Sequence, residues 1–403
     1  MLKDILGSLI ARLGAAGFGF LVLVYTSREL GLELRGELAY VLTLTLTIAA
    51  TVSFSIENAY VSYHKACGRE VNHASFFVYL LILSLLSFTI TFIVAYFLLG
   101  LSLGENILIC TLTSLSLLSK TLIGIYLKDG EVNKYNKNIF VTRAGYFVFA
   151  VVAVSFLELG VEGVLFALLI SLLMSLLIIF KEKRLLDVNL TKFRLDFFFI
   201  KHSLLVHATS IGTILISQVP IILIGAYGTR EDVGLFDVSM QLIGVVTLVV
   251  SSLSPVIYST LARLSDKEGT NMTFKLVKVA YILSLPIFLA LYFLAPEVLS
   301  LLFGEQYLGA TEVFRILLVM AYFSLLSYFV CPIWVVNGAS LKLSFVTICI
   351  GLINTVSTYF IMQIGSIKGV AIIMAGTSFI FFSCHCLFLA SKVAINSSLQ
   401  SRL

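Results

Sequence analysis

The stretch VGLFDVSMQLIGVVTLVVSSLSPVIYSTLARLS, residues 233–265, decides how this chain is interpreted, because a degenerate copy of it lies 198 residues upstream at 35–67. Aligned without gaps, the copies pair a glycine, a tyrosine and a basic residue: Gly234 with Gly36, Tyr258 with Tyr60, and Arg263 with Lys65. In each copy about twenty apolar or hydroxyl residues follow the glycine, which is enough for one membrane-crossing helix. A repeat at half the chain length predicts two similar helical bundles with a substrate site at the seam between them.

Composition places the rest of the chain in a membrane. Of 403 residues, 59% are hydrophobic and 12% are charged, and the mean hydropathy is +1.05. Uncharged runs long enough to cross a bilayer recur along the whole sequence, so we predict an all-α multi-pass membrane protein. Twelve transmembrane helices are expected, near residues 7–28, 37–63, 75–99, 104–128, 139–158, 161–181, 198–227, 234–262, 273–295, 310–336, 341–364 and 367–391.

The basic residues set the expected orientation. Most of the 27 lysines and arginines fall in loops on one side of the predicted helices. Cytoplasmic loops carry this excess, so both termini are predicted to be cytoplasmic. The net charge of +5 is then a loop bias, which argues against a nucleic-acid partner. Two pseudo-symmetric six-helix bundles are expected at residues 1–184 and 198–403, joined by a cytoplasmic linker at 185–197.

No metal, cofactor or catalytic constellation is expected. The six cysteines lie in or beside predicted helices without an extracellular pairing pattern, so free thiols are predicted. Cys384, His385 and Cys386 are consecutive, and neighbouring helical residues point about 100° apart, so they cannot converge on one ion without further ligands. The sequence therefore favours a transporter over an enzyme.

Three cations in the predicted first bundle are candidates for a site that attracts anions. Arg12, in the first helix, either snorkels to the interface or faces a cavity, and the sequence does not decide between these two interpretations. Lys120 shares a helix face with Thr113, Ser116 and Gly124 and lies deeper, which makes it the leading candidate for a cation in the cavity. Arg143 is shallower and closer to the interface.

Glu57 is the one carboxylate clearly inside a predicted helix of this half. It follows a hydroxyl stripe, Thr43, Thr47, Thr51 and Ser55, at steps of four residues. A buried carboxylate without a partner tends to stay protonated, and one beside a cation ionises. Glu57 is therefore a proton or cation coupling site, the counter-ion of Arg12, or an interfacial glutamate, and the sequence leaves these three open.

The second half carries a polar face and all the prolines. In the seventh predicted helix Ser210, Thr213, Ser217 and Pro220 share a face, with Gln218 alongside. All five prolines fall after residue 219, and proline inside a helix bends it. We therefore expect bent, gate-forming helices in the second bundle and a first bundle that moves as a rigid block.

At this point the residues resemble a known family, the polysaccharide and lipid-linked oligosaccharide flippases of the Wzx type in the multidrug/oligosaccharidyl-lipid/polysaccharide exporter superfamily. The matching pieces cover most of the chain in order: Arg28-Glu29-Leu30-Gly31 and Gly36, Val233–Ser239, Ser254-Pro255, Ala262-Arg263-Leu264, Ala295-Pro296, Leu302–Tyr307, Asn337-Gly338, Asn354, Gly365 and Gly369-Val370-Ala371. There are departures, because members often carry an acidic residue near Gln218 and a tyrosine at Phe236. The first departure shifts any coupling role toward Glu57.

The resemblance implies a V-shaped, alternating-access transporter in a bacterial inner membrane. Its substrate would be an undecaprenyl diphosphate-linked oligosaccharide repeat unit of an O-antigen, capsule or similar glycan. Arg12, Lys120 and Arg143 would bind the diphosphate, and Gln218 and Asn354 would help to bind substrate. Candidate partners are membrane lipids, a glycan polymerase and a chain-length regulator, and H⁺ or Na⁺ is the candidate coupling ion.

Two other functions remain as alternatives. An ion-coupled drug or metabolite exporter of the same superfamily would use the same scaffold, although a basic cavity disfavours cationic drugs. A membrane glycan polymerase or ligase needs a sizeable outer loop with catalytic residues, and the predicted outer loops are short. The flippase is therefore the leading hypothesis.

Overall fold

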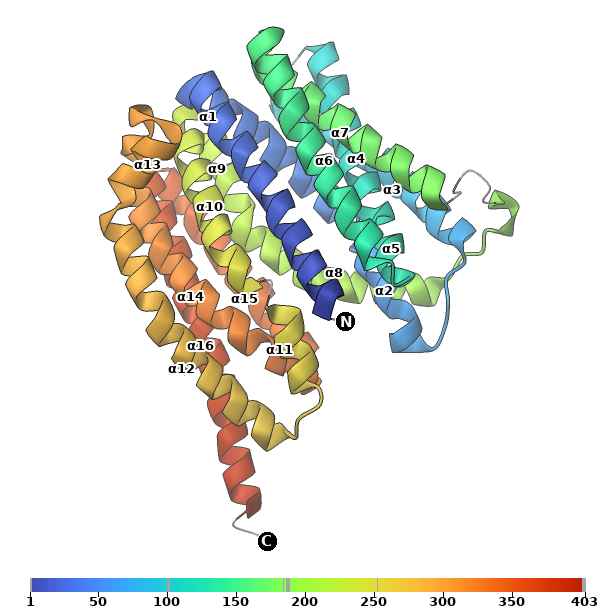
Figure 1. Cartoon of the computed structure of the whole chain (residues 1–403), viewed down its shortest axis with the longest axis vertical. Helices are drawn as coiled ribbons and strands as arrows, with labels where there is room; N and C mark the ends of the chain where they lie inside the picture. Colours follow the sequence, from blue (N-terminus) through green and yellow to red (C-terminus); the bar gives the residue numbers. More distant parts are fainter. Residues whose placement is uncertain are drawn as a thin grey trace. The chain divides into compact units, whose positions relative to one another are not determined.

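The structure is a computed structural model that describes residues 2–98, 100, 102–183, 185, 189–251 and 253–400. These residues are almost entirely helical and contain no β-strand (Figure 1). The predicted all-α class is therefore confirmed. By its internal contacts the chain divides into two compact units, Met1–Ile211 (unit 1) and Gly212–Leu403 (unit 2). The division falls inside a helix, α8, and not in the predicted linker at 185–197.

The helices follow one another with short connections. Unit 1 contains α1 (Leu2–Val52), α2 (Ile56–Cys67), α3 (His73–Leu98), α4 (Leu103–Leu122), α5 (Gly124–Lys128), α6 (Val132–Val151), the π-helix η1 (Val152–Phe156), α7 (Gly160–Lys183), the 3₁₀ turn η3 (Leu190–Lys192) and most of α8 (Phe197–Ser217). Unit 2 contains the end of α8, then α9 (Val219–Tyr227), α10 (Arg230–Ser251), α11 (Ser254–Leu261), α12 (Asp266–Phe293), α13 (Ala295–Phe303), the 3₁₀ helix η4 (Glu305–Ala310), α14 (Thr311–Val336), α15 (Ser340–Met362) and α16 (Ile367–Gln400).

Ten helical segments among the described residues are long and apolar enough to cross a membrane, so the chain is a multi-pass membrane protein. The first segment, Leu13–His64, has 52 residues and would be about 78 Å long at 1.5 Å per residue, far more than one crossing needs. Gly31 interrupts it with φ 77° and ψ 177°, a conformation that L side chains avoid. This segment therefore contains the first two predicted helices. The total of twelve helices stays a prediction.

The internal repeat is visible in where the helices break. In the first copy α1 ends at Val52 and α2 begins at Ile56, and in the second copy α10 ends at Ser251 and α11 begins at Ser254. Ile56 and Ser254 are the same position in the gapless alignment. Each copy was predicted to be one continuous helix, at 37–63 and 234–262, and that was wrong, because each is two helices meeting at a shared break.

The later helices repeat in order as well. Helices α4, α6 and α7 begin at Leu103, Val132 and Gly160. Helices α14, α15 and α16 begin 208, 208 and 207 residues further on. Helix α12 begins 193 residues after α3, so the fifteen residues by which this offset grows fall where α13 and η4 stand between α12 and α14. Each half thus runs through the same succession of long helices.

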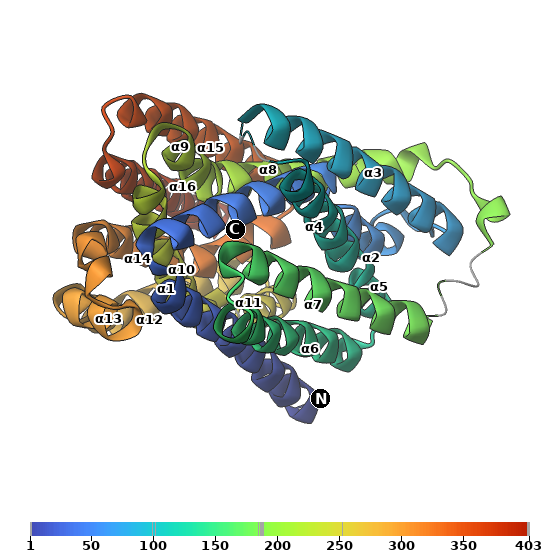
Figure 2. The same ribbon diagram turned by 90° about the horizontal axis from the view of Figure 1, so that it is seen from above.

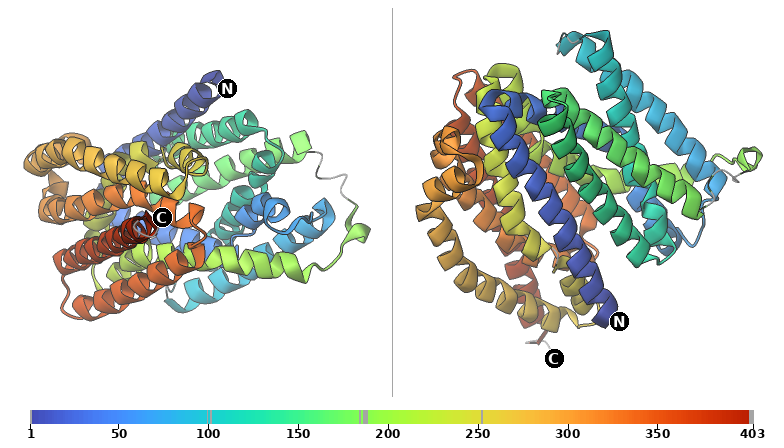
Figure 3. Two further views of the ribbon diagram at one scale, coloured as in Figure 1. Left: turned by 90° about the horizontal axis from the view of Figure 1, so that it is seen from below. Right: turned by 45° about the horizontal axis from the view of Figure 1, so that its top comes forward.

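Within unit 1, α1 packs against α3, α4, α6 and α7, as Figures 1 and 2 show for α4, α6 and α7. The core between these helices is aliphatic, with Leu38, Leu112 and Val164 no more than 1% exposed. Gly14 lets α1 and α6 approach closely, because a Cβ there would lie 3.0 Å from the Phe140 ring. In unit 2, α14 is the central helix and packs against α10, α11, α12, α13, α15 and α16 (Figure 3).

Prolines explain only part of the helix interruptions. Pro286 and Pro332 lie inside α12 and α14, whereas Pro220, Pro255 and Pro296 lie in the first turns of α9, α11 and α13. Proline is accepted in a first turn because its missing N–H has no partner there in any case. Unit 1 has no proline and is nevertheless interrupted at Gly31, at 53–55, at Ile123 and at η1. Interrupted helices are therefore not confined to the second half, and the expected difference in how the two halves move stays a prediction.

Candidate functional site

The candidate site is built around the break between α1 and α2. Phe54 has φ 47° and Ser55 has φ 51°, so two consecutive non-glycine residues lie in the left-handed region. Such residues cost of order 1–3 kcal/mol each and persist only where surrounding structure imposes them. Clusters of this kind are typical of functional sites. The break also starts a new helix immediately before Glu57.

The contacts that hold the break come from the first part of α8. Ser203 Oγ donates to the Phe54 carbonyl at 2.6 Å. Ser55 Oγ hydrogen-bonds with His207 Nδ1 at 3.1 Å and with Ser210 Oγ at 2.8 Å. The Phe54 ring meets the His207 ring edge to face, with centroids 5.5 Å apart. Helix α8 thus clamps both strained residues through three side chains spaced one turn apart.

Glu57 and Lys120 form an ion pair beside this break. Glu57 lies in the first turn of α2, where the positive end of the helix dipole favours a carboxylate. Its side chain is 10% exposed, and Oε1 lies 3.1 Å from Lys120 Nζ, whose side chain is 52% exposed. Gly124 packs against Glu57, since a Cβ at Gly124 would lie 3.5 Å from the Glu57 Cβ, an ordinary contact distance. The structure thus shows a buried carboxylate paired with Lys120, a pairing that none of the three interpretations of Glu57 included.

One buried polar atom of this cluster, Glu57 Oε2, has no hydrogen-bond partner among the described residues. Both Glu57 and Lys120 act electrostatically on His207, which places the three groups in one neighbourhood. A buried carboxylate oxygen without a partner is costly unless something binds it. The cluster can therefore accept a small cation at Glu57 Oε2, and Lys120 can exchange Glu57 for another anion.

The other two candidate cations of unit 1 are Arg12 and Arg143. The side chain of Arg12 lies outside the described residues. Arg143 is exposed on α6, and its Nη1 lies 4.0 Å from where a Cβ on Gly19 of α1 would stand. It makes no ion pair with a described residue. Arg143 therefore lies along the α1–α6 contact.

In unit 2, Gln218 and Asn354 both lie at the junction of α8 and α9. Gln218 is the N-cap of α9, and its Nε2 donates weakly to Ser217 Oγ at 3.4 Å. Asn354, fully buried on α15, donates to the carbonyls of Leu215 and Ile216 at 3.3 and 3.4 Å. In an unbroken helix the amide of residue 220 would serve the Ile216 carbonyl, but Pro220 has no amide hydrogen. The Asn354 side chain supplies the missing donor and so stabilises the break between α8 and α9.

Asn354 is also fixed from the other side, since Thr377 Oγ1 of α16 donates to Asn354 Oδ1 at 3.3 Å. Its amide is therefore committed to backbone and hydroxyl partners in this conformation. The side chain amide of Gln218 has no partner beyond Ser217 among described residues. Of these two, Gln218 is the one whose polar atoms remain available to a ligand.

The cysteines and histidines of the described chain form no metal-binding group. All six cysteines are free, and no group of three or more His, Cys, Asp or Glu residues could hold an ion among the residues searched. His385 is fully buried, with its ring against Trp334 and Phe381. Cys384 and Cys386 flank it in sequence and do not join it in a site.

Sequence reasoning missed His207 and Ser203. Only Ser210 was noticed, as part of a hydroxyl face. Ser203, His207 and Ser210 are spaced i, i+4 and i+7, which puts three polar residues on one face of a helix in an apolar context. That stripe was readable in the sequence. The left-handed turn that it holds was not, because neither Phe54 nor Ser55 favours φ > 0.

Comparison with known proteins shows a family match and a shared fold. A family model described as polysaccharide biosynthesis protein matches residues 35–312. Among curated proteins, none shows significant sequence similarity to this chain.

Solved structures share its fold at low sequence identity. The inward closed conformation of the lipid II flippase MurJ superposes with a TM-score of 0.75 at 15% identity, covering 95% of this chain and 87% of that one. An inward-facing multidrug resistance transporter of the MATE family in the MOP superfamily gives 0.68 at 16%, covering 94% and 95%. A MOP superfamily transporter from Pyrococcus furiosus, described as having a binding pocket of reverse polarity, gives 0.63 at 16%, covering 98% and 95%.

Proposed function

The chain belongs to the polysaccharide biosynthesis protein family, and on this premise we propose that it flips lipid-linked oligosaccharide repeat units across a bacterial inner membrane. The family resemblance that the sequence motifs carried is thereby confirmed. The proposed substrate is an undecaprenyl diphosphate-linked repeat unit of an O-antigen, capsule or similar glycan, moved from the cytoplasmic to the outer leaflet. The proposed architecture is two six-helix bundles that alternate access, with both termini in the cytoplasm.

The chemistry of such a substrate sets what the protein must do. The polyprenyl tail is soluble in the bilayer, whereas the diphosphate and sugars are too polar to cross hydrocarbon unaided. The transporter therefore has to shelter only the head group. If the cytoplasm is negative, each exported negative charge gains about 2.3 kcal/mol per 100 mV, so an anionic head moves electrically downhill.

The observation that carries the proposal is the Glu57–Lys120 pair. Lys120 is half exposed and reaches a carboxylate that keeps one oxygen without a partner. When a diphosphate draws Lys120 away, the buried Glu57 loses its counter-charge, and a buried carboxylate without a cation takes up a proton or Na⁺ instead. Substrate binding and ion uptake are thereby linked at one residue pair. No resident cofactor enters this scheme.

The remaining candidates take supporting roles in the proposal. Arg12 and Arg143 add positive charge near α1, and Gln218 offers an amide to the glycan. Asn354 acts by keeping the α8–α9 junction open. A glycan polymerase and a chain-length regulator are proposed to receive the flipped unit.

Complementation of a flippase-deficient strain tests the proposal. Lys120→Ala is expected to abolish surface glycan at unchanged protein level, and Lys120→Arg to retain part of it, because a guanidinium also pairs with phosphate. Lys134→Ala is the matched control, since that lysine lies in an exposed pair with Glu131. Full glycan display by Lys120→Ala would remove Lys120 from the site.

The second candidate function is ion-coupled export of a drug or metabolite. The match to the MATE transporter over 94% of this chain supports it at the level of the fold. Drug accumulation in cells that express the protein separates the two functions. Reduced accumulation without any effect on surface glycan favours the exporter.

A further inference from the structure

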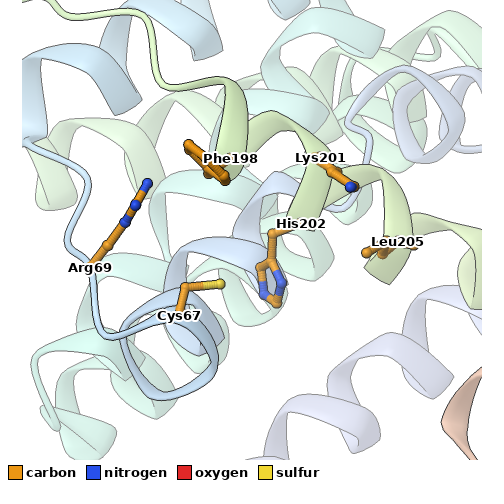
Figure 4. A pocket seen from close by; sticks show the side chains of 6 residues that line it. All are labelled: Cys67, Arg69, Phe198, Lys201, His202 and Leu205. Carbon is orange, nitrogen blue, oxygen red and sulfur yellow. The ribbon is translucent and has the colours of Figure 1, made fainter.

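Unit 1 contains a pocket of about 280 Å³ away from the Glu57–Lys120 pair. It is lined by Cys67 and Arg69, at and after the end of α2, and by Phe198, Lys201, His202 and Leu205 of α8 (Figure 4). Cys67 and Arg69 lie in the loop between two membrane-spanning segments, and the α8 residues lie in the first turns of another. The pocket is therefore at a membrane boundary. Its volume suits a lipid head group rather than a whole lipid.

The cations of this pocket lack carboxylate partners. Arg69 lies over the Phe198 ring at 4.2 Å, and neither Arg69 nor Lys201 forms an ion pair with a described residue. The nearby carboxylates are engaged elsewhere, since Asp196 accepts from the Tyr63 hydroxyl and Glu70 lies 3.8 Å from His64. His202 uses Nε2 to contact Ser62 Oγ at 2.9 Å, and its Nδ1 has no partner in the described chain.

Three other lysines of unit 1, Lys120, Lys134 and Lys183, are arranged differently. Lys183 contacts both Asp129 and Glu131, and together with Lys134 it holds the pKa of the Glu131 carboxyl below its ordinary value. Lys120 pairs with Glu57. Their charge is balanced within the protein. The charge of Arg69 and Lys201 is not, so the pocket attracts an anion from outside.

The rim of the pocket is apolar and exposed. Phe198 and Leu205 are 61% and 50% exposed. Large exposed aromatic and aliphatic side chains beside cations are typical of a protein surface at the head-group level of a bilayer. A soluble anion makes no use of such a rim, whereas a lipid presents its phosphate to the cations and its glycerol and upper acyl chains to the rim.

We propose that this pocket binds the phosphate of an anionic phospholipid of the leaflet on its own side of the membrane. Arg69 and Lys201 contact the phosphate oxygens, His202 Nδ1 donates to the head group, and Phe198 and Leu205 contact the acyl chains. The proposal does not rest on the flippase function. It assigns a structural lipid to the place where the loop after α2 meets α8.

The test uses the full chain with one tryptophan at the pocket. Trp334 is the only tryptophan, so Trp334→Phe with Phe198→Trp reports on this position alone. The protein is placed in nanodiscs of phosphatidylcholine containing brominated phosphatidylglycerol or brominated phosphatidylcholine, and quenching is compared. We expect apparent affinity for phosphatidylglycerol at least fivefold above that for phosphatidylcholine. Each basic residue near an anionic surface contributes about fivefold, the equivalent of ~1 kcal/mol.

A charge-matched control separates a site from a basic surface. Arg69→Gln with Lys201→Gln is expected to abolish the preference, and Lys192→Gln with Arg194→Gln, which removes two exposed charges from the adjoining linker, is expected to keep it. An equal loss in both pairs overturns the proposal in favour of general surface charge. Displacement of the bound lipid by millimolar inorganic phosphate overturns the assignment to a lipid.

Discussion

The two copies of the repeat break at the same position by different means. In the first copy, Phe54 and Ser55 are left-handed, and the break is held by Ser203, His207 and Ser210 of α8. In the second copy, Leu253, the position equivalent to Ser55, has an ordinary φ of −81°, and Pro255 stands in the first turn of α11. The break in the first copy is imposed by contacts with residues distant in sequence. The break in the second copy is favoured by a proline beside it.

The difference indicates which break can respond to a ligand. A proline fixes its φ and removes a backbone donor whatever surrounds it. Serine and phenylalanine residues with left-handed backbone conformations persist only where contacts with neighbouring residues impose them. Glu57 lies in the first turn of the helix that follows the strained pair, so a change in its charge acts on a break that can relax. The first copy is therefore the better candidate for the moving part, contrary to the expectation of a rigid first half.

The largest effect is expected from His207→Ala. The change removes the ring that packs on Phe54 and the hydrogen bond to Ser55. Loss of a buried ring with its hydrogen bond costs about 3 kcal/mol. Thermal unfolding of the purified protein in detergent measures this. Leu204→Ala, an exposed neighbour on the same helix, is the control and should change stability by less than about 0.5 kcal/mol. Equal effects would show that α8 does not hold the break.

A second effect of about 2 kcal/mol is expected from Asn354→Leu. It leaves the Ile216 carbonyl without its side-chain donor and the Leu215 carbonyl with Thr355 Oγ1 alone, at 3.4 Å, which costs roughly 1–3 kcal/mol. Pro220→Ala restores a backbone amide that can serve Ile216. The double variant should therefore regain part of the loss in the same unfolding experiment. If Pro220→Ala adds its own destabilisation to that of Asn354→Leu, the side chain is not replacing the missing amide.

The membrane class and the internal repeat could be predicted from the sequence alone, whereas most contacts of the candidate site could not. Hydropathy and glycine-based motifs carry the fold because they are local and repeated along the chain. Lys120 and Glu57 were both singled out as isolated charges in apolar helices. Their pairing was not predicted, because a turn that neither Phe54 nor Ser55 favours sets the direction of Glu57. The same reasoning missed His207, whose partners lie about 150 residues away in sequence.

Relief of backbone strain at Phe54 should be measurable as a gain in stability once the His207 side chain has been removed. In the wild-type background, Phe54→Gly loses the ring contact with His207 and gains backbone freedom, so the two effects oppose each other. In the His207→Ala background the ring contact is already absent. Phe54→Gly should then restore about 1 kcal/mol, because glycine adopts φ 47° without the penalty of a side chain. A further loss of stability in the double variant would mean that the left-handed turn carries no strain.

The smallest effect is expected at the second break. Pro255→Ala keeps the first turn of α11 compatible with a helix and mainly increases the freedom of the unfolded chain, a change of about 0.4–1 kcal/mol. Hydrogen exchange at residues 253–261 should remain close to wild type, whereas His207→Ala should increase exchange at residues 53–59. Increased exchange in both regions, or in the second alone, would mean that the second break also depends on distant contacts. Since only a break held by contacts can be released by changing them, that result would move the responsive element to the second copy.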